Sequence, residues 1–143
     1  MSYCAIILAA GKGHRYSKTI PKQYTVFDNE LIINYSLKIF SELKPIKKII
    51  LVINKPQFTK FKDQVYKNKK ITIIQGGKER KDSVLLALSK LKKNNYKKVL
   101  IHDAARPFLK KILINKIIKF SKKNDAVIPC ITNTDTIVFK NKI

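Results

Sequence analysis

Runs of apolar residues of strand length alternate along the chain with segments of helical period. The runs are rich in Ile, Val and Leu, as expected of strands covered on both faces. They comprise residues Tyr3–Ala9, Lys48–Ile53, Ile71–Gln75, Lys98–Asp103 and Ala126–Ile131. Helices are predicted over Glu30–Leu43, Gln57–Tyr66, Glu79–Leu91 and Lys110–Ser121. This alternation predicts a Rossmann-like, three-layer α/β/α fold with a mainly parallel open sheet and ligands beyond the carboxyl ends of its strands.

Two shorter segments complete this prediction. Asp28 and Asn29 precede the first helical segment and are interpreted as its cap, because Asp and Asn are favoured at that position. Residues Asp135–Phe139 are expected to begin another strand. The 143 residues, of which 45% are hydrophobic, suit a single domain over residues 1–143, or most of a somewhat larger one.

The amino-terminal residues and the cysteines indicate a cytoplasmic protein. Met1–Tyr3 lacks a basic leader region, and the apolar run Cys4–Ala10 is too short to span a bilayer, so no membrane association is expected. Cys4 and Cys130 lie far apart in apolar runs and match no metal-binding spacing. We therefore expect buried free thiols and neither a disulfide nor a zinc site.

The net charge of +22 raises the possibility of a nucleic-acid partner. Lysines occur in nearly every polar stretch, however, and form no single stripe interleaved with aromatic residues. A solvated lysine surface is the favoured interpretation. A basic nucleic-acid-binding domain on an inactive enzyme fold is kept as the alternative.

All four glycines and all three arginines lie in three short segments, each at the end of a predicted strand. The segments are Leu8–Arg15, Gly76–Arg80 and His102–Pro107. Glycine allows backbone to turn sharply or to approach a ligand closely, and arginine presents a planar, permanently charged fork. These segments are where a functional site is expected.

The first segment has the position of a phosphate-binding loop but matches neither of the two best-known kinds. A dinucleotide fingerprint needs a third glycine, and a P-loop needs Ser or Thr after Gly-Lys. Instead Arg15 and Lys22 place two cations in one long loop beside Gly11 and Gly13, which suits a triphosphate. A tight turn would explain the glycines alone equally well.

The other two segments carry a candidate base-binding turn and a candidate metal ligand. Gly76 and Gly77 expose backbone groups, and the Ser83 hydroxyl follows in the next helix, although a simple capped turn would also explain them. Asp103 ends a strand, where one carboxylate could hold Mg²⁺ against substrate phosphates. His102 is interpreted as a packed strand residue.

Taken in order, these motifs resemble the 2-C-methyl-D-erythritol 4-phosphate cytidylyltransferases of the non-mevalonate isoprenoid pathway. The resemblance runs from residue 4 to about 140. It rests on the motifs Leu8–Arg15, Pro21–Tyr24, Gly76–Gly77 with Arg80, Asp82–Val84, His102–Phe108 and Asp135–Thr136. Gly-x-Gly-x-x-Arg alone would indicate only the wider nucleotidyltransferase superfamily. Relatives acting on ribitol 5-phosphate look similar but more often carry Val at the position of Ala105.

The resemblance implies transfer of CMP from CTP to a sugar-alcohol phosphate, with Mg²⁺ or another divalent cation as cofactor. It implies that Arg15 and Lys22 are catalytic and that Asp103 holds the metal. The implied nucleotide-binding residues are Ala9, Ala10, Gly11, Gly13, Gly77, Lys78 and Ser83. The implied substrate-binding residues are Asp103, Ala104, Arg106 and Thr136. Lys78 departs from the family, which often has an acidic residue there.

The resemblance also implies further chain and a second subunit. Family members continue past Asp135–Thr136 into the rest of a dimer-forming arm, whose start would lie near residues 132–143, and into further acceptor-binding residues. A homodimer is expected of the full-length family, in the cytoplasm or a plastid stroma. A ribitol 5-phosphate or other sugar-phosphate nucleotidyltransferase is the nearest alternative activity.

Overall fold

The computed structural model describes residues 2–11, 19–91 and 96–132. The expected strand Asp135–Phe139 lies outside these residues. The chain divides into two compact units, residues 1–111 and 112–143. The single-domain assignment and the arm near residues 132–143 stay predictions.

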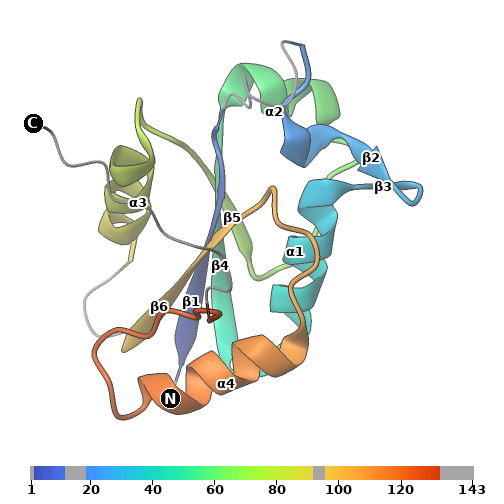
Figure 1. Cartoon of the computed structure of the whole chain (residues 1–143). Coiled ribbons are helices and arrows are strands. Elements are labelled where there is room, and N and C mark those ends of the chain that lie inside the picture. The colour runs from blue at the N-terminus through green and yellow to red at the C-terminus, as the bar shows by residue number, and fades with distance from the viewer. Residues whose placement is uncertain (1, 12–18, 92–95, 133–143) are drawn as a thin grey trace, which may run out of the picture. The chain divides into compact units, whose positions relative to one another are not determined.

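A four-stranded parallel sheet forms the centre of the first unit (Figure 1). Its strands are β1 (Tyr3–Ala9), β4 (Ile46–Ile53), β5 (Ile71–Gln75) and β6 (Lys98–Asp103), in the order β5-β4-β1-β6. The chain adds strands on one side of β1 and then crosses to its other side, which creates a topological switch point between β1 and β6. The predicted parallel α/β sheet is therefore confirmed.

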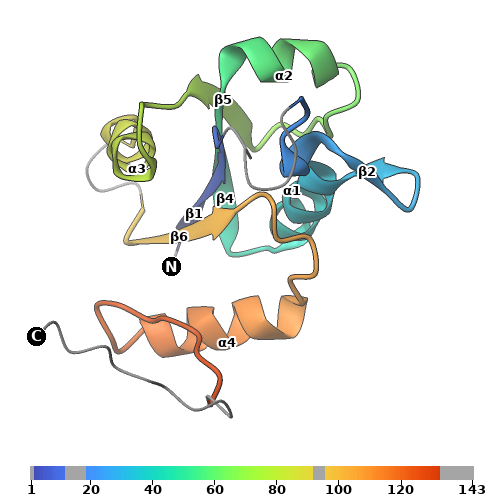
Figure 2. The same cartoon turned by 45° about the horizontal axis from the view of Figure 1, so that its top comes forward.

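Helices cover both faces of this sheet. Helices α1 (Ile32–Glu42) and α3 (Arg80–Ser89) lie on opposite sides of it (Figure 2). Successive strand residues point to opposite faces, so Cys4 and Ile6 of β1 pack with Ala87 of α3 in one buried cluster. On α1, the buried face carries Ile33, Leu37 and Phe40. The three-layer arrangement follows from these two apolar helix faces.

The predicted cap at Asp28 and Asn29 is wrong, because these residues form the turn of a short hairpin. Strands β2 (Val26–Phe27) and β3 (Glu30–Leu31) pair antiparallel across them. Asp28 has φ of 48° and Asn29 has φ of 62°, the left-handed pair of values that a tight two-residue hairpin turn requires. Asp and Asn tolerate this conformation better than other residues with a side chain, and they are also favoured at helix caps. The two residues that suggested a helix cap therefore form a hairpin turn. Helix α1 starts at Ile32 with no side-chain cap.

Helix α2 (Lys55–Phe61) starts two residues earlier and ends five residues earlier than the predicted Gln57–Tyr66. Its cap is Asn54, whose side-chain oxygen accepts a hydrogen bond from the Gln57 backbone N–H at 3.3 Å. A single-turn 3-10 helix, η1 (Lys22–Tyr24), precedes the hairpin. It places Lys22 and Gln23 at the sheet edge where the strands end.

Helix α4 (Lys111–Ser121) starts one residue later than the predicted Lys110–Ser121, and all of it after Lys111 lies in the second unit. The fifth predicted strand is not formed. Residues 126–132 adopt no regular structure, and Ile128 and Ile131 are exposed. Cys130 is exposed as well, so its predicted burial is wrong, whereas Cys4 is buried and burial raises the pKa of its thiol to about 11. Both thiols are free. None of the helices described is long and apolar enough to cross a membrane.

Candidate functional site

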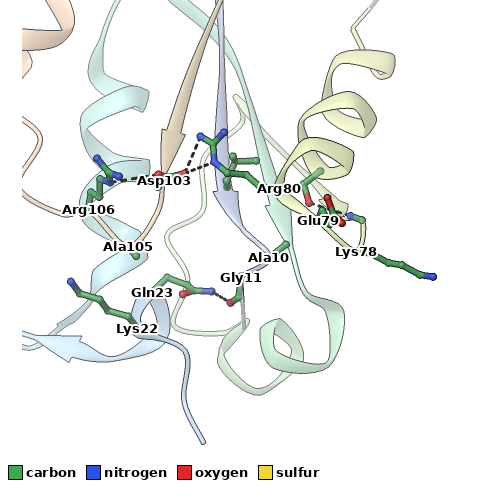
Figure 3. A pocket seen from close by; sticks show the side chains of 13 residues that line it. Ala10, Gly11, Lys22, Gln23, Lys78, Glu79, Arg80, Asp103, Ala105 and Arg106 are labelled. Atoms are coloured by element: carbon green, nitrogen blue, oxygen red, sulfur yellow. Dashed lines mark hydrogen bonds and ion pairs between the residues drawn. The ribbon is translucent and has the colours of Figure 1, made fainter. Parts of the chain in front are cut away.

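A pocket of about 460 Å³ lies at the carboxyl ends of the strands, entirely within the first unit. Its walls come from the chain after β1, after β5 and after β6, together with η1 (Figure 3). Among the described residues, four cationic side chains and two carboxylates line it, namely Lys22, Lys78, Arg80 and Arg106 against Glu79 and Asp103. The excess of positive charge suits an anionic ligand such as a triphosphate.

The Gly76–Gly77 turn brings backbone close to the sheet at one wall of the pocket. The Gly76 N–H donates to the Ile53 carbonyl at 2.8 Å, and the Gly77 N–H donates to Ser83 Oγ at 3.1 Å. A Cβ at position 76 would lie 2.6 Å from Ala10 Cβ and 2.8 Å from Ser83 Oγ. Glycine is therefore required here for close approach. Because Ser83 Oγ accepts from Gly77, its own hydroxyl hydrogen remains available to another acceptor.

Gln23 fixes the start of the first glycine segment. Its Nε2 donates to the carbonyls of Ala9 and Gly11, both at 2.8 Å. Gln23 is buried, while its neighbour Lys22 is exposed and lines the pocket. The side chain of Lys22 has no ion pair with any residue that the structure describes. Its ammonium is thus available to a ligand.

Asp103, the last residue of β6, lies between two arginines (Figure 3). Its Oδ1 accepts hydrogen bonds from Arg80 Nε and Nη2, both at 3.2 Å. Its Oδ2 is 3.5 Å from Arg106 Nε. Arg80 comes from the first residue of α3 and Arg106 from the loop after β6, so the carboxylate links two walls of the pocket.

The donor set fits a divalent cation held mainly by substrate. No group of three or more His, Cys, Asp or Glu side chains suited to a metal occurs within residues 2–11, 19–91 and 96–132. Glu79 is engaged elsewhere, since its side chain caps the first turn of α3 and pairs with Lys81. Asp103 remains as the one pocket carboxylate outside the helix cap, and Mg²⁺ commonly binds proteins through one or two carboxylates while keeping phosphate and water ligands.

His102 supports the loop that carries Arg106. Its Nε2 lies 3.1 Å from Ser36 Oγ of α1 and 3.1 Å from the Arg106 carbonyl, and its ring packs on Phe40 at a centroid distance of 5.6 Å. The carbonyl oxygen can only accept, so Nε2 carries the hydrogen. The interpretation of His102 as a packed strand residue agrees with these contacts.

The pH dependence of stability should report on His102. Burial lowers the pKa of this imidazole below its ordinary value, so the unfolded chain binds a proton more readily than the folded one. The free energy of unfolding should therefore fall as the pH drops below about 6.5 toward the lower folded pKa. Melting temperatures at pH 7.5 and 5.5 should differ less in His102→Gln than in the unmodified chain. The chain has one other histidine, so His14→Gln is the control, and an equal change in both variants would contradict this assignment.

Eight of the predicted site residues line the pocket together. They are Ala10, Gly11, Lys22, Gly77, Lys78, Ser83, Asp103 and Arg106. Ala9 and Ala104 are buried behind it, where the Ala104 N–H donates to the Leu8 carbonyl at 2.9 Å. Gly13, Arg15 and Thr136 lie outside the described residues.

Sequence reasoning missed two residues of this site. Arg80 is one of only three arginines in the chain and lies in one of the motifs, but the sequence alone assigns it no role. Gln23 directly follows Lys22, and no feature of the sequence indicates that it hydrogen-bonds back to the end of β1. The rarity of arginine was the signal that could have identified Arg80.

A sequence model of the family 2-C-methyl-D-erythritol 4-phosphate cytidylyltransferase (IspD) matches residues 3–142. The bifunctional enzyme IspD/IspF of Pelagibacter ubique is 41% identical over 143 residues, covering 100% of this chain and 38% of that protein. The 2-C-methyl-D-erythritol 4-phosphate cytidylyltransferase of Clostridium perfringens strain SM101 is 41% identical over 140 residues, covering 96% of this chain and 61% of that protein. The chain thus spans less than two thirds of the length of these relatives.

Solved structures show the same similarity. The 4-diphosphocytidyl-2C-methyl-D-erythritol synthase of Anaerococcus prevotii superposes with a TM-score of 0.72 at 31% identity, over 86% of this chain and 52% of that one. The bifunctional IspDF of Campylobacter jejuni superposes with a TM-score of 0.81 at 28% identity, over 97% of this chain and 36% of that one.

Proposed function

Because the chain belongs to the 2-C-methyl-D-erythritol 4-phosphate cytidylyltransferase family, we propose that it takes part in transfer of CMP from CTP to 2-C-methyl-D-erythritol 4-phosphate. Pyrophosphate is the other product, and the reaction belongs to non-mevalonate isoprenoid biosynthesis. The observation that carries the proposal is one pocket lined by the Gly77–Ser83 turn, by Lys22 and by Asp103 with Arg106. The turn offers backbone groups and a hydroxyl to a nucleotide, and the cationic side chains suit its triphosphate and an anionic acceptor.

In the proposed reaction, a phosphate oxygen of the acceptor attacks the α-phosphorus of CTP. A new P–O bond forms as the bond to the bridging oxygen breaks, and pyrophosphate leaves with that electron pair. The attacking oxygen is already an anion, so no general base is needed, and catalysis consists of alignment and charge stabilisation. Lys22 and Arg15 neutralise charge that develops around the α-phosphorus. Mg²⁺, when bound at Asp103, supplies positive charge against the substrate phosphates.

The remaining residues divide between the two substrates. Ala9, Ala10, Gly11, Gly13, Gly77, Lys78 and Ser83 surround the nucleotide. The hydroxyl hydrogen that Ser83 retains is a donor for the base, and the turn at Gly77 supplies backbone groups. Ala104, Arg106 and Thr136 are assigned to the acceptor. Homodimer formation and a cytoplasmic or plastid location stay predictions, which gel filtration and fractionation would test.

Pyrophosphate release by this chain tests the proposal directly. The assay contains Mg²⁺, CTP and 2-C-methyl-D-erythritol 4-phosphate, with ATP and ribitol 5-phosphate as competing substrates and Arg15→Ala as the control variant. Release that needs CTP, the methylerythritol acceptor and Arg15 is the expected result. Preference for ribitol 5-phosphate would assign the alternative acceptor. Absence of CTP binding, together with salt-sensitive DNA binding, would favour the nucleic-acid alternative.

A further inference from the structure

The ion pairs of Asp103 occupy the carboxylate that a metal would need. Arg80 directs both Nε and Nη2 to Oδ1 at 3.2 Å, and Arg106 Nε approaches Oδ2 at 3.5 Å (Figure 3). Each oxygen therefore already faces a guanidinium. A free divalent cation therefore competes with two guanidinium groups for this carboxylate, and it must enter a pocket whose described lining side chains carry more positive than negative charge.

Arg80 and Arg106 differ in what they connect. Arg106 lies in the loop that follows Asp103, three residues further along the chain. Arg80 follows the Gly77–Glu79 segment, which lines the pocket on the wall assigned to the nucleotide. The side chain of Arg80 is 64% exposed, and its hydrogen bonds and ion pairs with described residues all go to Asp103. A triphosphate in the pocket would compete with Asp103 for this guanidinium, since arginine binds phosphate and carboxylate with the same fork.

We propose that Arg80 is a positioning residue that holds Asp103 when the pocket is empty and releases it when nucleotide phosphates enter. The metal then binds together with the nucleotide and not before it. The inference rests on the proposed function for the identity of the nucleotide, but the contact between Arg80 and Asp103 stands without it. The strict consequence is that Arg80 lowers the affinity of the empty site for a divalent cation.

Mn²⁺ titration of the ¹⁵N-labelled chain without nucleotide tests this consequence, because paramagnetic broadening detects weak binding. The amide signals of Asp103, Ala104 and Ala105 are followed. In Arg80→Gln they should broaden at an Mn²⁺ concentration about two- to five-fold lower than in the unmodified chain, the range set by the modest strength of exposed ion pairs. Arg80→Lys keeps the charge without the fork and should lie between the two.

Lys81→Gln is the matched control. It removes the same charge from the neighbouring residue, whose ammonium pairs with Glu79 and not with Asp103. This variant should broaden the three amide signals at the same Mn²⁺ concentration as the unmodified chain. The double variant Arg80→Gln/Asp103→Asn should lose the increase in Mn²⁺ affinity that Arg80→Gln shows, which would place the cation at Asp103.

Two results would overturn the proposal. One is broadening at the same Mn²⁺ concentration in Arg80→Gln and in the unmodified chain. The other is an equal increase in Mn²⁺ affinity in Lys81→Gln, which would reflect net charge alone. The amide spectrum without metal verifies that each variant is folded. CTP binding, followed separately at the Gly77 and Ser83 amides, tests the proposed function. The role of Arg80 and the proposed function can therefore fail independently of each other.

Discussion

Replacement of Lys22 by alanine is expected to lower the rate of the proposed cytidylyl transfer by about 10²- to 10³-fold, the usual loss for one preorganised transition-state donor. The ammonium is exposed in the pocket and has no ion pair with the residues described. Its backbone position is set, because the Lys22 carbonyl accepts from the Thr25 N–H at 3.1 Å and from Thr25 Oγ1 at 2.8 Å. The side chain can therefore be removed with little effect on the fold.

The measurement is kcat and KM for CTP in parallel with the unmodified chain. A charge that acts mainly in the transition state lowers kcat more than it raises KM. Lys22→Arg should recover part of the rate. Lys47→Ala removes an equal charge from near the amino end of β4, far along the strand from the pocket, and should keep full activity. A Lys22→Ala variant with near-normal kcat would remove Lys22 from the catalytic residues.

Replacement of Gly76 by alanine should destabilise the fold by about 1–3 kcal/mol, the typical cost of overpacking, and should abolish nucleotide binding. The added methyl group would meet Ala10 Cβ at 2.6 Å, Ser83 Oγ at 2.8 Å and Val52 Cγ1 at 3.1 Å. Relief requires the Gly76–Gly77 turn to move away from Ala10 and the Ser83 hydroxyl to shift, which disrupts the hydrogen bond from the Gly77 N–H to Ser83 Oγ. Urea unfolding and CTP titration measure the two effects.

Two variants make this prediction sharper. Gly11→Ala adds a methyl group in the same pocket, where no atom of the described residues lies within 4 Å of it, so its unfolding free energy should change little. Ala10→Gly combined with Gly76→Ala removes the shortest contact and should regain part of the stability, as coupled neighbouring sites do. Equal unfolding free energies for Gly76→Ala and Gly11→Ala would contradict the close approach of the Gly76–Gly77 turn to Ala10, at the end of β1.

The sheet could be predicted because its strands are continuous apolar runs. The bounds of β1, β5 and β6 agree with the sequence-based ranges. The central strand β1 is buried along nearly its whole length, as its unbroken apolar run indicates, whereas the edge strands β5 and β6 are half-buried or exposed although their runs are also rich in Ile, Val and Leu. Residues 126–131 give a similar signal but form no strand. Pro129 interrupts that run and removes a backbone donor, and apolar character alone does not tell whether a partner strand is present.

The site was predictable in its composition but not in its contacts. The glycines and arginines marked three segments, and the parallel sheet brings the ends of β1, β5 and β6 to one edge. The pairing of Arg80 with Asp103 joins residues 23 positions apart. It depends on the strand order and on side chains at the start of α3 and at the end of β6, and the periodicity of a sequence does not contain this information. The same holds for the two hydrogen bonds of Gln23.

Those two hydrogen bonds of Gln23 have a thermodynamic consequence for ligand affinity. By tying Gln23 to the Gly11 carbonyl, 12 residues earlier, they join both ends of the segment that carries Gly13 and Arg15. Closing a chain of that length costs about 2 kcal/mol of entropy on the (3/2)RT ln n scale. Here that entropy is lost once, when the protein folds. A triphosphate that binds in the pocket does not have to bring Gly11 and Gln23 together, so more of its contact energy appears as binding.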